Sequence, residues 1–189
     1  MVDEVSELDL PQSVIDLLVN EWNITRLHPP QAEALPVALS GENLLLAIPT
    51  ASGKSLVAYL AIIQQILVEK PGSRAFYLVP LKALASEKVE ELREAGESLG
   101  FTVGMAVGDR AGETVSLDQA DVIVATSEKF DSLMRNRDGF LNQVSIVVAD
   151  EVHLIHDQSR GPTMAVSYTH LRAHETREDL GCRLVLEKK

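Results

Sequence analysis

The stretch that decides the fold runs Leu44-Leu45-Leu46-Ala47-Ile48-Pro49-Thr50-Ala51-Ser52-Gly53-Lys54-Ser55. Its apolar first half predicts a buried strand, the small residues after it predict a tight loop, and the apolar periodicity of residues 56–68 predicts a helix. A strand, a tight loop and a helix start form a phosphate-binding loop, whose backbone N–H groups point inward and bind phosphate oxygens. The positive N-terminal end of the helix adds to this attraction.

Two side chains at the end of this stretch would complete the phosphate site. Lys54 would neutralise the β- and γ-phosphates of a nucleotide, and the Ser55 hydroxyl would be a ligand of Mg²⁺. Further nucleotide contacts are expected from the loop residues Pro49, Thr50, Ala51, Ser52 and Gly53. The strict pattern has glycine where this chain has Ile48. Gly-Lys-Ser alone also fits a turn before a solvated helix start, so a second motif has to decide.

Length and composition limit the class of protein. With 189 residues, 46% of them apolar and 4% aromatic, we expect one domain with a mainly aliphatic core. The acidic N-terminus does not resemble a secretory signal, and no stretch approaches the ~20 apolar residues of a membrane span, so we expect a soluble, cytoplasmic protein with no membrane partner. The single cysteine, Cys182, excludes an internal disulfide framework and a cysteine metal site. The net charge of −11 argues only weakly against nucleic-acid binding, because net charge does not describe local contacts.

The rest of the chain alternates apolar strands with helices, after an acidic segment, residues 1–12, that we expect to be disordered. Helices are expected at residues 13–22, 31–39, 54–69 and 83–99 and from residue 127, and strands at 44–48, 74–79, 101–107, 122–125 and 144–149. Strands that are apolar throughout and alternate with helices indicate a mostly parallel sheet covered on both faces. Right-handed crossovers then place the carboxyl ends of the strands at one edge, where ligands bind.

A second motif, Val147-Val148-Ala149-Asp150-Glu151, ends the last of these strands with two adjacent carboxylates. At the edge that holds the phosphate loop, Asp150 would bind Mg²⁺ directly or through water, and Glu151 would orient and deprotonate the attacking water. An acidic strand end can also simply cap the next helix. Because Lys54 and Ser55 follow an apolar strand of their own, we favour an ATP-hydrolysing site in which the two strand ends lie side by side.

Five segments, in this order along the chain, carry a family resemblance: PPQAEA, IPTASGKS, VPLKALASEK, TSEKFDSL and VADEVHLI. The series is similar to the first motor domain of superfamily-two helicases, and most similar to the superkiller-type DNA helicases of archaea, which act at stalled replication forks. The resemblance covers about residues 10–164. It implies an α/β fold, a RecA-like P-loop NTPase domain with helices on both faces of the sheet, that uses ATP and Mg²⁺.

The resemblance also assigns roles by position. Gln31 would recognise the adenine edge of ATP through its amide, although it can instead be an ordinary residue of a helix N-terminus. His153 would couple the nucleotide state to the nucleic-acid side. The residues that match contacts to the single-strand backbone are Pro80, Leu81, Lys82 and Ala83, and Thr126 and Ser127 with Glu128 and Lys129. Helix N-termini and small hydroxyls suit such phosphate contacts, but a helix cap at residues 126–128, with Ser127 as the N-cap, and a solvated Lys82 are equally good interpretations.

The end of the chain departs from the family pattern. That pattern would continue with a helix, a Ser-Ala-Thr strand and a second motor domain that carries arginine fingers, and we find none of these in the sequence. Residues 166–189 resemble the translation of a transposase-type sequencing adapter instead. We therefore expect a C-terminally truncated domain at residues 13–165 and a non-native tail at 166–189, a native terminal helix being the alternative.

The sequence thus predicts part of an ATP-dependent 3′-to-5′ DNA helicase that moves along single-stranded or forked DNA in repair or replication restart. An arginine finger supplies about 10³–10⁵ in rate. Since the missing second motor domain would carry it, we expect this chain alone to bind nucleotide weakly and not to turn it over rapidly. Two alternatives stay open: a non-motor nucleic-acid-binding module with a vestigial nucleotide site, and an RNA helicase of the same type, RNA being the less expected partner.

Overall fold

The computed structural model describes residues 4–48, 53–108, 110–111, 117–136, 143–151 and 182–188. Its helical segments are η1 (Val5–Glu7), α1 (Gln12–Asp16), η2 (Leu17–Glu21), α2 (Pro29–Leu39), α3 (Lys54–Gln64), η3 (Gln65–Glu69), α4 (Lys82–Leu99) and α5 (Ser127–Asn136). Its strands are β1 (Leu44–Ile48), β2 (Arg74–Val79), β3 (Val103–Val107), β4 (Arg110–Ala111), β5 (Val122–Thr126), β6 (Val144–Ala149) and β7 (Cys182–Lys188). The helices and strands expected from the sequence are all present, and η2 and η3 are π-helical turns that prolong α1 and α3. Among the helices of these ranges, none combines the length and the apolar character needed to cross a membrane.

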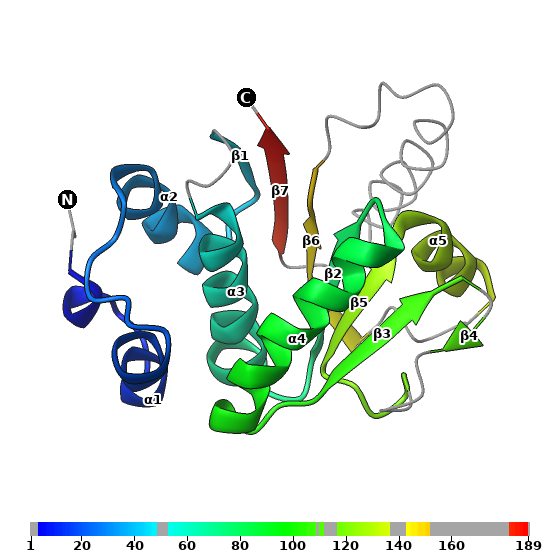
Figure 1. The fold of residues 1–189 in the computed structure, drawn as a ribbon, viewed down its shortest axis with the longest axis horizontal. Coiled ribbons are helices and arrows are strands. Elements are labelled where there is room, and N and C mark those ends of the chain that lie inside the picture. Colours follow the sequence, from blue (N-terminus) through cyan, green and yellow to red (C-terminus); the bar gives the residue numbers. More distant parts are fainter. Residues whose placement is uncertain are drawn as a thin grey trace.

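The strands form one sheet in the order β1-β7-β6-β2-β5-β3-β4 (Figure 1). All neighbouring strands run parallel except β3 and β4, which are antiparallel. The predicted mostly parallel sheet is therefore confirmed. Because parallel strands share their direction, the ends of β1, β2, β5 and β6 that carry the sequence motifs meet at the same edge.

Helices cover both faces of this sheet, as the sequence predicted. Since side chains alternate between the faces along a strand, Ala75, Tyr77 and Val79 of β2 join the core under α1 to α4, which Figure 1 shows with α3 and α4 in front of the strands. Phe76 of the same strand joins a second core under α5 on the other face. There its ring meets Phe130 edge to face, with the ring centroids 4.8 Å apart. The two cores fix the sheet between helix layers and hold its carboxyl edge in place.

Strand β1 is less buried than the sequence predicted. Leu46 is 7% exposed and joins the core under α2 and α3, whereas Leu45 is 62% exposed. The prediction of a buried strand is therefore wrong for one of its faces. The physical reason is position, because β1 is the outermost strand of the described sheet and only its inner face is covered by helices.

The N-terminal segment is described from residue 4 onward and contacts the rest of the fold, while the expected disorder of residues 1–12 stays a prediction. Val5 is fully buried and donates its N–H to the carbonyl of Thr25 at 3.1 Å. Glu4 forms an isolated antiparallel bridge with Arg26. Val5 attaches the segment to the turn before α2, and the acidic composition of the segment did not indicate this contact.

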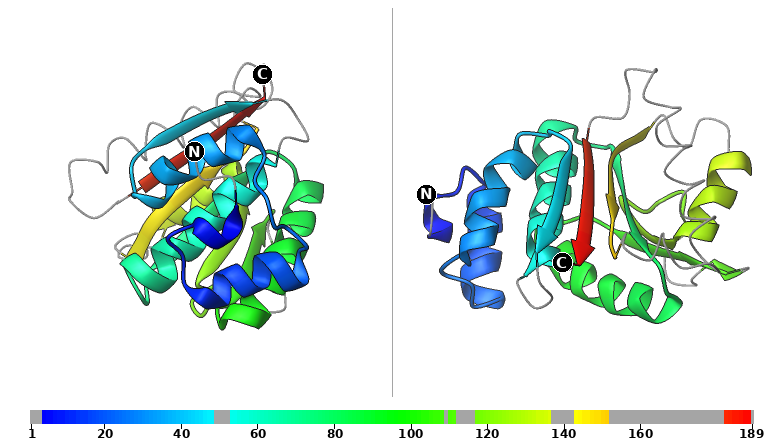
Figure 2. Two further views of the ribbon diagram at one scale, coloured as in Figure 1. Left: turned by 90° about the vertical axis from the view of Figure 1, so that its left-hand side faces the viewer. Right: turned by 90° about the horizontal axis from the view of Figure 1, so that it is seen from above.

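Residues 182–188, which the sequence predicts to lie in a non-native tail, form strand β7. This strand lies between β1 and β6 (Figure 2), with Leu46 opposite Leu186 and Val148 opposite Leu184. The expectation that β1 and β6 are direct neighbours is therefore wrong, and about 10 Å separates them, which is two strand spacings. That residues 166–189 are a non-native tail stays a prediction, which the presence of β7 does not test.

Candidate nucleotide and metal site

The described part of the phosphate loop begins at Gly53, since residues 49–52 lie outside the described residues. Gly53 has φ of 72°, in the left-handed region that favours glycine. A Cβ atom at this position would lie 2.0 Å from Nε2 of Gln31, so no other residue fits without displacing that amide. Lys54 and Ser55 follow as the first residues of α3, and Lys54 is 8% exposed. The loop therefore ends in a tight turn that brings both side chains to the edge of the sheet.

Gln31 connects helix α2 to this turn. Its Oε1 accepts the backbone N–H of His28 at 2.8 Å, and its Nε2 donates to the carbonyl of Gly53 at 3.1 Å. The residue is 3% exposed. These bonds match the interpretation of Gln31 as a helix N-terminal residue. Its contact with adenine stays a prediction, for which the amide has a second N–H and a second Oε1 lone pair beyond these two bonds.

Asp150 follows β6 and is held from several sides. Its backbone N–H donates to the carbonyl of Leu78 at 2.9 Å, its Oδ2 accepts the hydroxyl of Tyr77 at 2.9 Å, and its Oδ1 accepts the N–H of Glu151 at 2.8 Å. Burial raises the pKa of the Asp150 carboxyl, the bond from Tyr77 opposes this rise, and the charge of Glu151 adds to it. The carboxylate is thus rigidly placed and costly to keep ionised.

Glu151 has a strained backbone. Its φ of 55° lies in the left-handed region. For a residue with a side chain, this conformation costs on the order of 1–3 kcal/mol and is found preferentially at functional sites. This strained position directly follows Asp150 in the chain.

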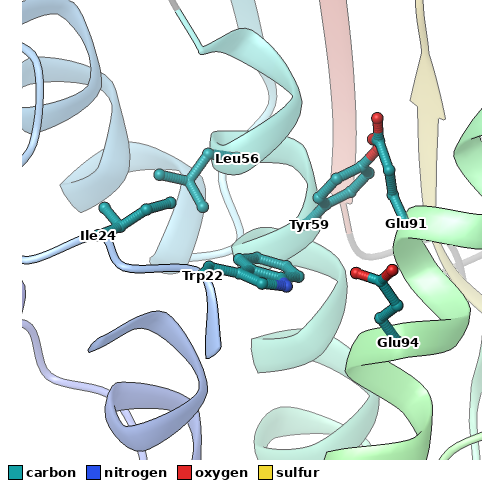
Figure 3. A pocket seen from close by; sticks show the side chains of 6 residues that line it. All are labelled: Trp22, Ile24, Leu56, Tyr59, Glu91 and Glu94. Atoms are coloured by element: carbon teal, nitrogen blue, oxygen red, sulfur yellow. The ribbon is translucent and has the colours of Figure 1, made fainter. Parts of the chain in front are cut away.

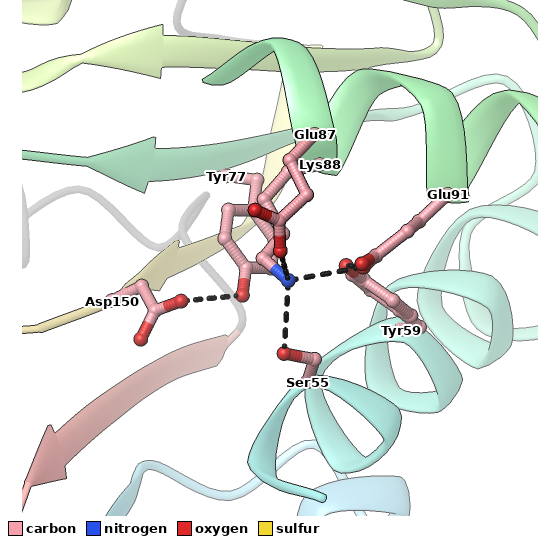
Figure 4. Close-up of polar contacts among 7 residues, drawn as sticks. All are labelled: Ser55, Tyr59, Tyr77, Glu87, Lys88, Glu91 and Asp150. Atoms are coloured by element: carbon pink, nitrogen blue, oxygen red, sulfur yellow. Dashed lines mark hydrogen bonds and ion pairs between the residues drawn. The ribbon is translucent and has the colours of Figure 1, made fainter. Parts of the chain in front are cut away.

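Lys88 of α4 reaches the same edge and contacts Ser55. Its Nζ donates to Ser55 Oγ at 3.3 Å and forms ion pairs with Glu91 at 3.0 Å and Glu87 at 3.4 Å (Figure 4). Figure 4 shows the Lys88 ammonium beside the Tyr77 hydroxyl, with the Ser55 and Asp150 side chains both directed toward this pair. Burial raises the pKa of the Tyr77 hydroxyl and of the Asp150 carboxyl, a side-chain hydrogen bond with Ser55 opposes this rise at Tyr77, and the charge of Lys88 opposes it at Asp150. The first and second motifs are therefore brought into one polar network, although β7 lies between β1 and β6.

Two tyrosines complete this network. Tyr59 of α3 donates its hydroxyl to Glu91, and its ring centroid lies 5.8 Å from that of Tyr77. Burial is the main cause that raises the pKa of both hydroxyls, and the Glu91 carboxylate adds to it at Tyr59, as Asp150 does at Tyr77. Both tyrosines consequently stay neutral hydrogen-bond donors over the working range of pH.

The donor set fits magnesium. Mg²⁺ prefers oxygen ligands and is usually held by one or two carboxylates together with phosphates and water, not by a cage made of protein alone. The Ser55 hydroxyl and the Asp150 carboxylate are such donors and belong to the same network. Within the described residues, no group of three or more His, Cys, Asp or Glu side chains is placed to hold a metal. Magnesium held by Ser55 and Asp150 would take its further oxygen ligands from phosphates and water.

The two segments expected to contact a nucleic-acid backbone lie next to each other. Val79 pairs with Thr126 in the sheet, so residues 80–83 and residue 127 follow from neighbouring strand ends. Leu81 is 39% exposed, whereas Ser127 is only 7% exposed. Ser127 is the first residue of α5 and not the N-cap that the sequence suggested. The backbone contacts stay a prediction.

The remaining residues of these two segments differ in exposure. Lys82 and Ala83 are exposed, and Pro80 and Thr126 are half-buried. His153, the expected coupling residue, lies outside the described residues.

Sequence reasoning missed Lys88, Glu91 and the two tyrosines. A signal was present for Lys88, because it shares the buried face of α4 with Ala85 and Leu92, where a lysine is out of place. No comparable signal pointed to Tyr77, since an aromatic residue is ordinary in a strand.

Comparison with known proteins identifies the family. The DEAD/DEAH box helicase model matches residues 28–184. The chain belongs to this family. The recognition of a superfamily-two helicase, RecA-like domain from the sequence motifs is thereby confirmed. The matched range also includes part of the segment 166–189, whose origin stays a prediction.

Curated relatives include proteins named ATP-dependent DNA helicase Hel308. The chain is 48% identical over 174 residues to the one from Methanocella arvoryzae, 46% over 169 residues to that from Pyrococcus abyssi and 47% over 169 residues to that from Thermococcus kodakarensis. Each alignment covers 89% of this chain. The chain spans 23% of the length of the first two relatives and 15% of the third, so it corresponds to a minor part of these proteins.

Solved structures share the fold. A hypothetical ATP-dependent RNA helicase from Sulfolobus tokodaii superposes with a TM-score of 0.74 at 17% identity, over 95% of this chain and 51% of that one. The DUF1998 helicase MrfA, in a structure with DNA and AMPPNP, gives a TM-score of 0.77 at 22% identity, over 95% of this chain and 26% of that one. These values confirm the α/β architecture.

Proposed function

We propose that this chain is the nucleotide-binding part of an ATP-dependent DNA helicase, in which ATP hydrolysis drives movement along single-stranded or forked DNA. The relatives with 46–48% identity carry this activity in their names. The chain spans 23% of the length of the first two of them, and the proposal assigns the activity to a longer parent protein in which, as the family resemblance implies, a second motor domain completes the site.

The observation that carries this proposal is the convergence of Ser55 and Asp150 on one network at the carboxyl edge of the sheet. Asp150 accepts a hydrogen bond from the Tyr77 hydroxyl, and Ser55, which accepts one from Lys88, also forms a side-chain hydrogen bond with that hydroxyl. A hydroxyl after a phosphate loop and a carboxylate at the end of another strand of the same sheet are oxygen donors that suit a magnesium–nucleotide complex. Magnesium, when bound, would supply positive charge to the transferred phosphate.

The chain's own residues would then act as follows. Lys54 would neutralise the phosphates from the start of α3. Glu151, whose backbone N–H donates to Asp150 Oδ1, would orient the attacking water with its carboxylate and accept the proton. The half of the site that stabilises the leaving phosphates with an arginine would come from the second motor domain.

Nucleic acid would contact the same edge of the sheet. The neighbouring segments at residues 80–83 and 126–127 would bind backbone phosphates, because helix N-termini and small hydroxyls suit such contacts. Contacts of this kind position a strand without recognising its sequence. The choice of DNA over RNA therefore rests on the relatives and not on these residues.

Linkage between nucleotide and strand binding tests the proposal. The affinity of the chain for a single-stranded DNA oligonucleotide is measured by fluorescence anisotropy, without nucleotide and with saturating Mg²⁺ and a non-hydrolysable ATP analogue. We expect the analogue to change the affinity by about fivefold or more, in line with common coupling energies, and Lys54→Ala to abolish the change. If the analogue does not change the affinity for the DNA oligonucleotide, the result would favour a non-motor binding module with a vestigial nucleotide site. Equal linkage and tighter binding with an RNA oligonucleotide would favour an RNA helicase.

A further inference from the structure

Lys88 is a buried cation to which the site described above gives no role. The residue is 8% exposed, and its Nζ lies 3.3 Å from Ser55 Oγ, 3.0 Å from Glu91 Oε2 and 3.4 Å from Glu87 Oε1 (Figure 4). A lysine is almost never this deeply buried unless it is paired. Here two partners are carboxylates of its own helix, and the third is the hydroxyl expected to bind magnesium.

Magnesium bound to the Ser55 hydroxyl would lie close to the Lys88 ammonium. Magnesium binds oxygen at about 2.0–2.1 Å, so a metal on Ser55 Oγ would lie at most about 5.4 Å from the Lys88 ammonium. Two positive charges at this separation in a partly buried site repel each other strongly. Binding of either cation at Ser55 Oγ therefore disfavours the other at its present distance.

The surroundings allow the ammonium to withdraw toward α4. The side chain of Glu91 is 40% exposed and that of Glu87 is 57% exposed, so both can follow the ammonium away from Ser55. Glu91 also borders a pocket of about 300 Å³ between α3, α4 and the segment before α2 (Figure 3). Trp22, the single tryptophan of the chain, lines this pocket, and its ring centroid lies 6.2 Å from that of Tyr59.

We propose that Lys88 competes with the divalent metal for the Ser55 hydroxyl and passes to Glu91 and Glu87 when the metal–nucleotide complex binds. This inference rests on the proposed function, because it assumes that Ser55 is a metal ligand. Lys88 is then a positioning residue, because its movement from Ser55 to Glu91 and Glu87 couples metal binding to helix α4. Helix α4 begins at Lys82, about 9 Å along the helix axis from Lys88, within the segment expected to contact the nucleic-acid backbone.

A magnesium titration of the ADP-saturated chain tests this competition. Binding is followed by calorimetry and by Trp22 fluorescence. Lys88→Met removes the charge at similar length, and we expect it to lower the half-saturating Mg²⁺ concentration by about tenfold. Glu91→Gln removes the main acceptor of the displaced ammonium, and we expect it to raise that concentration by about threefold. Lys88→Arg, which keeps the charge, and the exposed control Lys70→Met should both stay near the wild type.

The two substitutions are expected to act in opposite directions, which keeps the test decisive. An unchanged or higher half-saturating concentration in Lys88→Met overturns the inference. If that variant does not fold, the more exposed Glu91→Gln carries the test, and an unchanged or lower concentration overturns the inference. Failure of the proposed function is distinct from both, since the wild type would then show no ADP binding that depends on magnesium and Lys54.

Discussion

The hydrogen bond between Tyr77 and Asp150 is the contact whose loss can be predicted in most detail. Tyr77→Phe removes only the hydroxyl that donates to Asp150 Oδ2 at 2.9 Å, and it leaves no cavity of consequence because the ring remains. Tyr77 is fully buried and Asp150 is 9% exposed, so water cannot replace the lost donor freely. A hydrogen bond to a charged group contributes about 1.5–3 kcal/mol, and we expect the free energy of unfolding at neutral pH to fall by this amount.

The melting temperature measures this cost. For a chain of this size, about 2–4 °C is lost per kcal/mol, so Tyr77→Phe should melt about 3–12 °C below the wild type at neutral pH. The cost should depend on pH, because the bond opposes the rise in the pKa of Asp150 and its loss raises that pKa further. When folding raises the pKa of a carboxyl, the free energy of unfolding falls as pH rises through the folded pKa. The gap between the two proteins should therefore be small in acid and widen as pH rises.

The assay is thermal unfolding followed by circular dichroism, over a series of pH values, with Asp150→Asn as the reference background. A neutral amide accepts a weaker hydrogen bond than a carboxylate, so Tyr77→Phe should cost only about 0.5–1.5 kcal/mol in that background. A cost that is the same at every pH and in both backgrounds would refute the reasoning, since it would show that the carboxylate is not the partner that matters.

Two further predictions concern Asp150 and β7. Asp150→Asn should raise the melting temperature at neutral pH, because burial raises the pKa of this carboxyl above its ordinary value of 3.8 and the ionised form therefore destabilises the fold. Its advantage over the wild type should grow as pH rises through the folded pKa, and a variant less stable than the wild type at neutral pH would contradict this. Val185→Pro should destabilise the chain by at least about 1–3 kcal/mol in urea titrations, because Val185 is paired with Leu45 on one side and Ala149 on the other and proline removes a ladder donor. Val185→Thr is the matched control, and a proline variant as stable as this control would show that β7 does not hold the sheet together.

The sequence predicted the elements well because their signals are local. The apolar runs at residues 74–79 and 144–149 coincide with β2 and β6, and both motifs lie at the carboxyl edge, as expected for parallel strands. The placement of β7 between β1 and β6 could not be predicted in the same way. Residues 182–188 were set aside because of a resemblance to an adapter, although the run Leu184-Val185-Leu186 has ordinary strand character.

Contacts between distant residues account for the rest of what was missed. Lys88 and Ser55 are 33 residues apart and lie on different helices, so no periodicity connects them. Val5 is anchored by a segment twenty residues later, which an acidic composition does not reveal. Gln31 was noticed, but its two bonds to His28 and Gly53 depend on how α2 meets the phosphate loop, and this is a property of the packing.

The central claim is that Lys54, Ser55 and Asp150 form one magnesium–nucleotide site, and an ADP titration tests it most directly. Calorimetry in the presence of Mg²⁺ compares the wild type with Lys54→Ala and with Lys70→Ala, a control at an exposed lysine. We expect the wild type and the control to bind with the same affinity, and Lys54→Ala to bind at least about tenfold more weakly, which corresponds to about 1.4 kcal/mol. Equal affinity of all three proteins for ADP would contradict the claim.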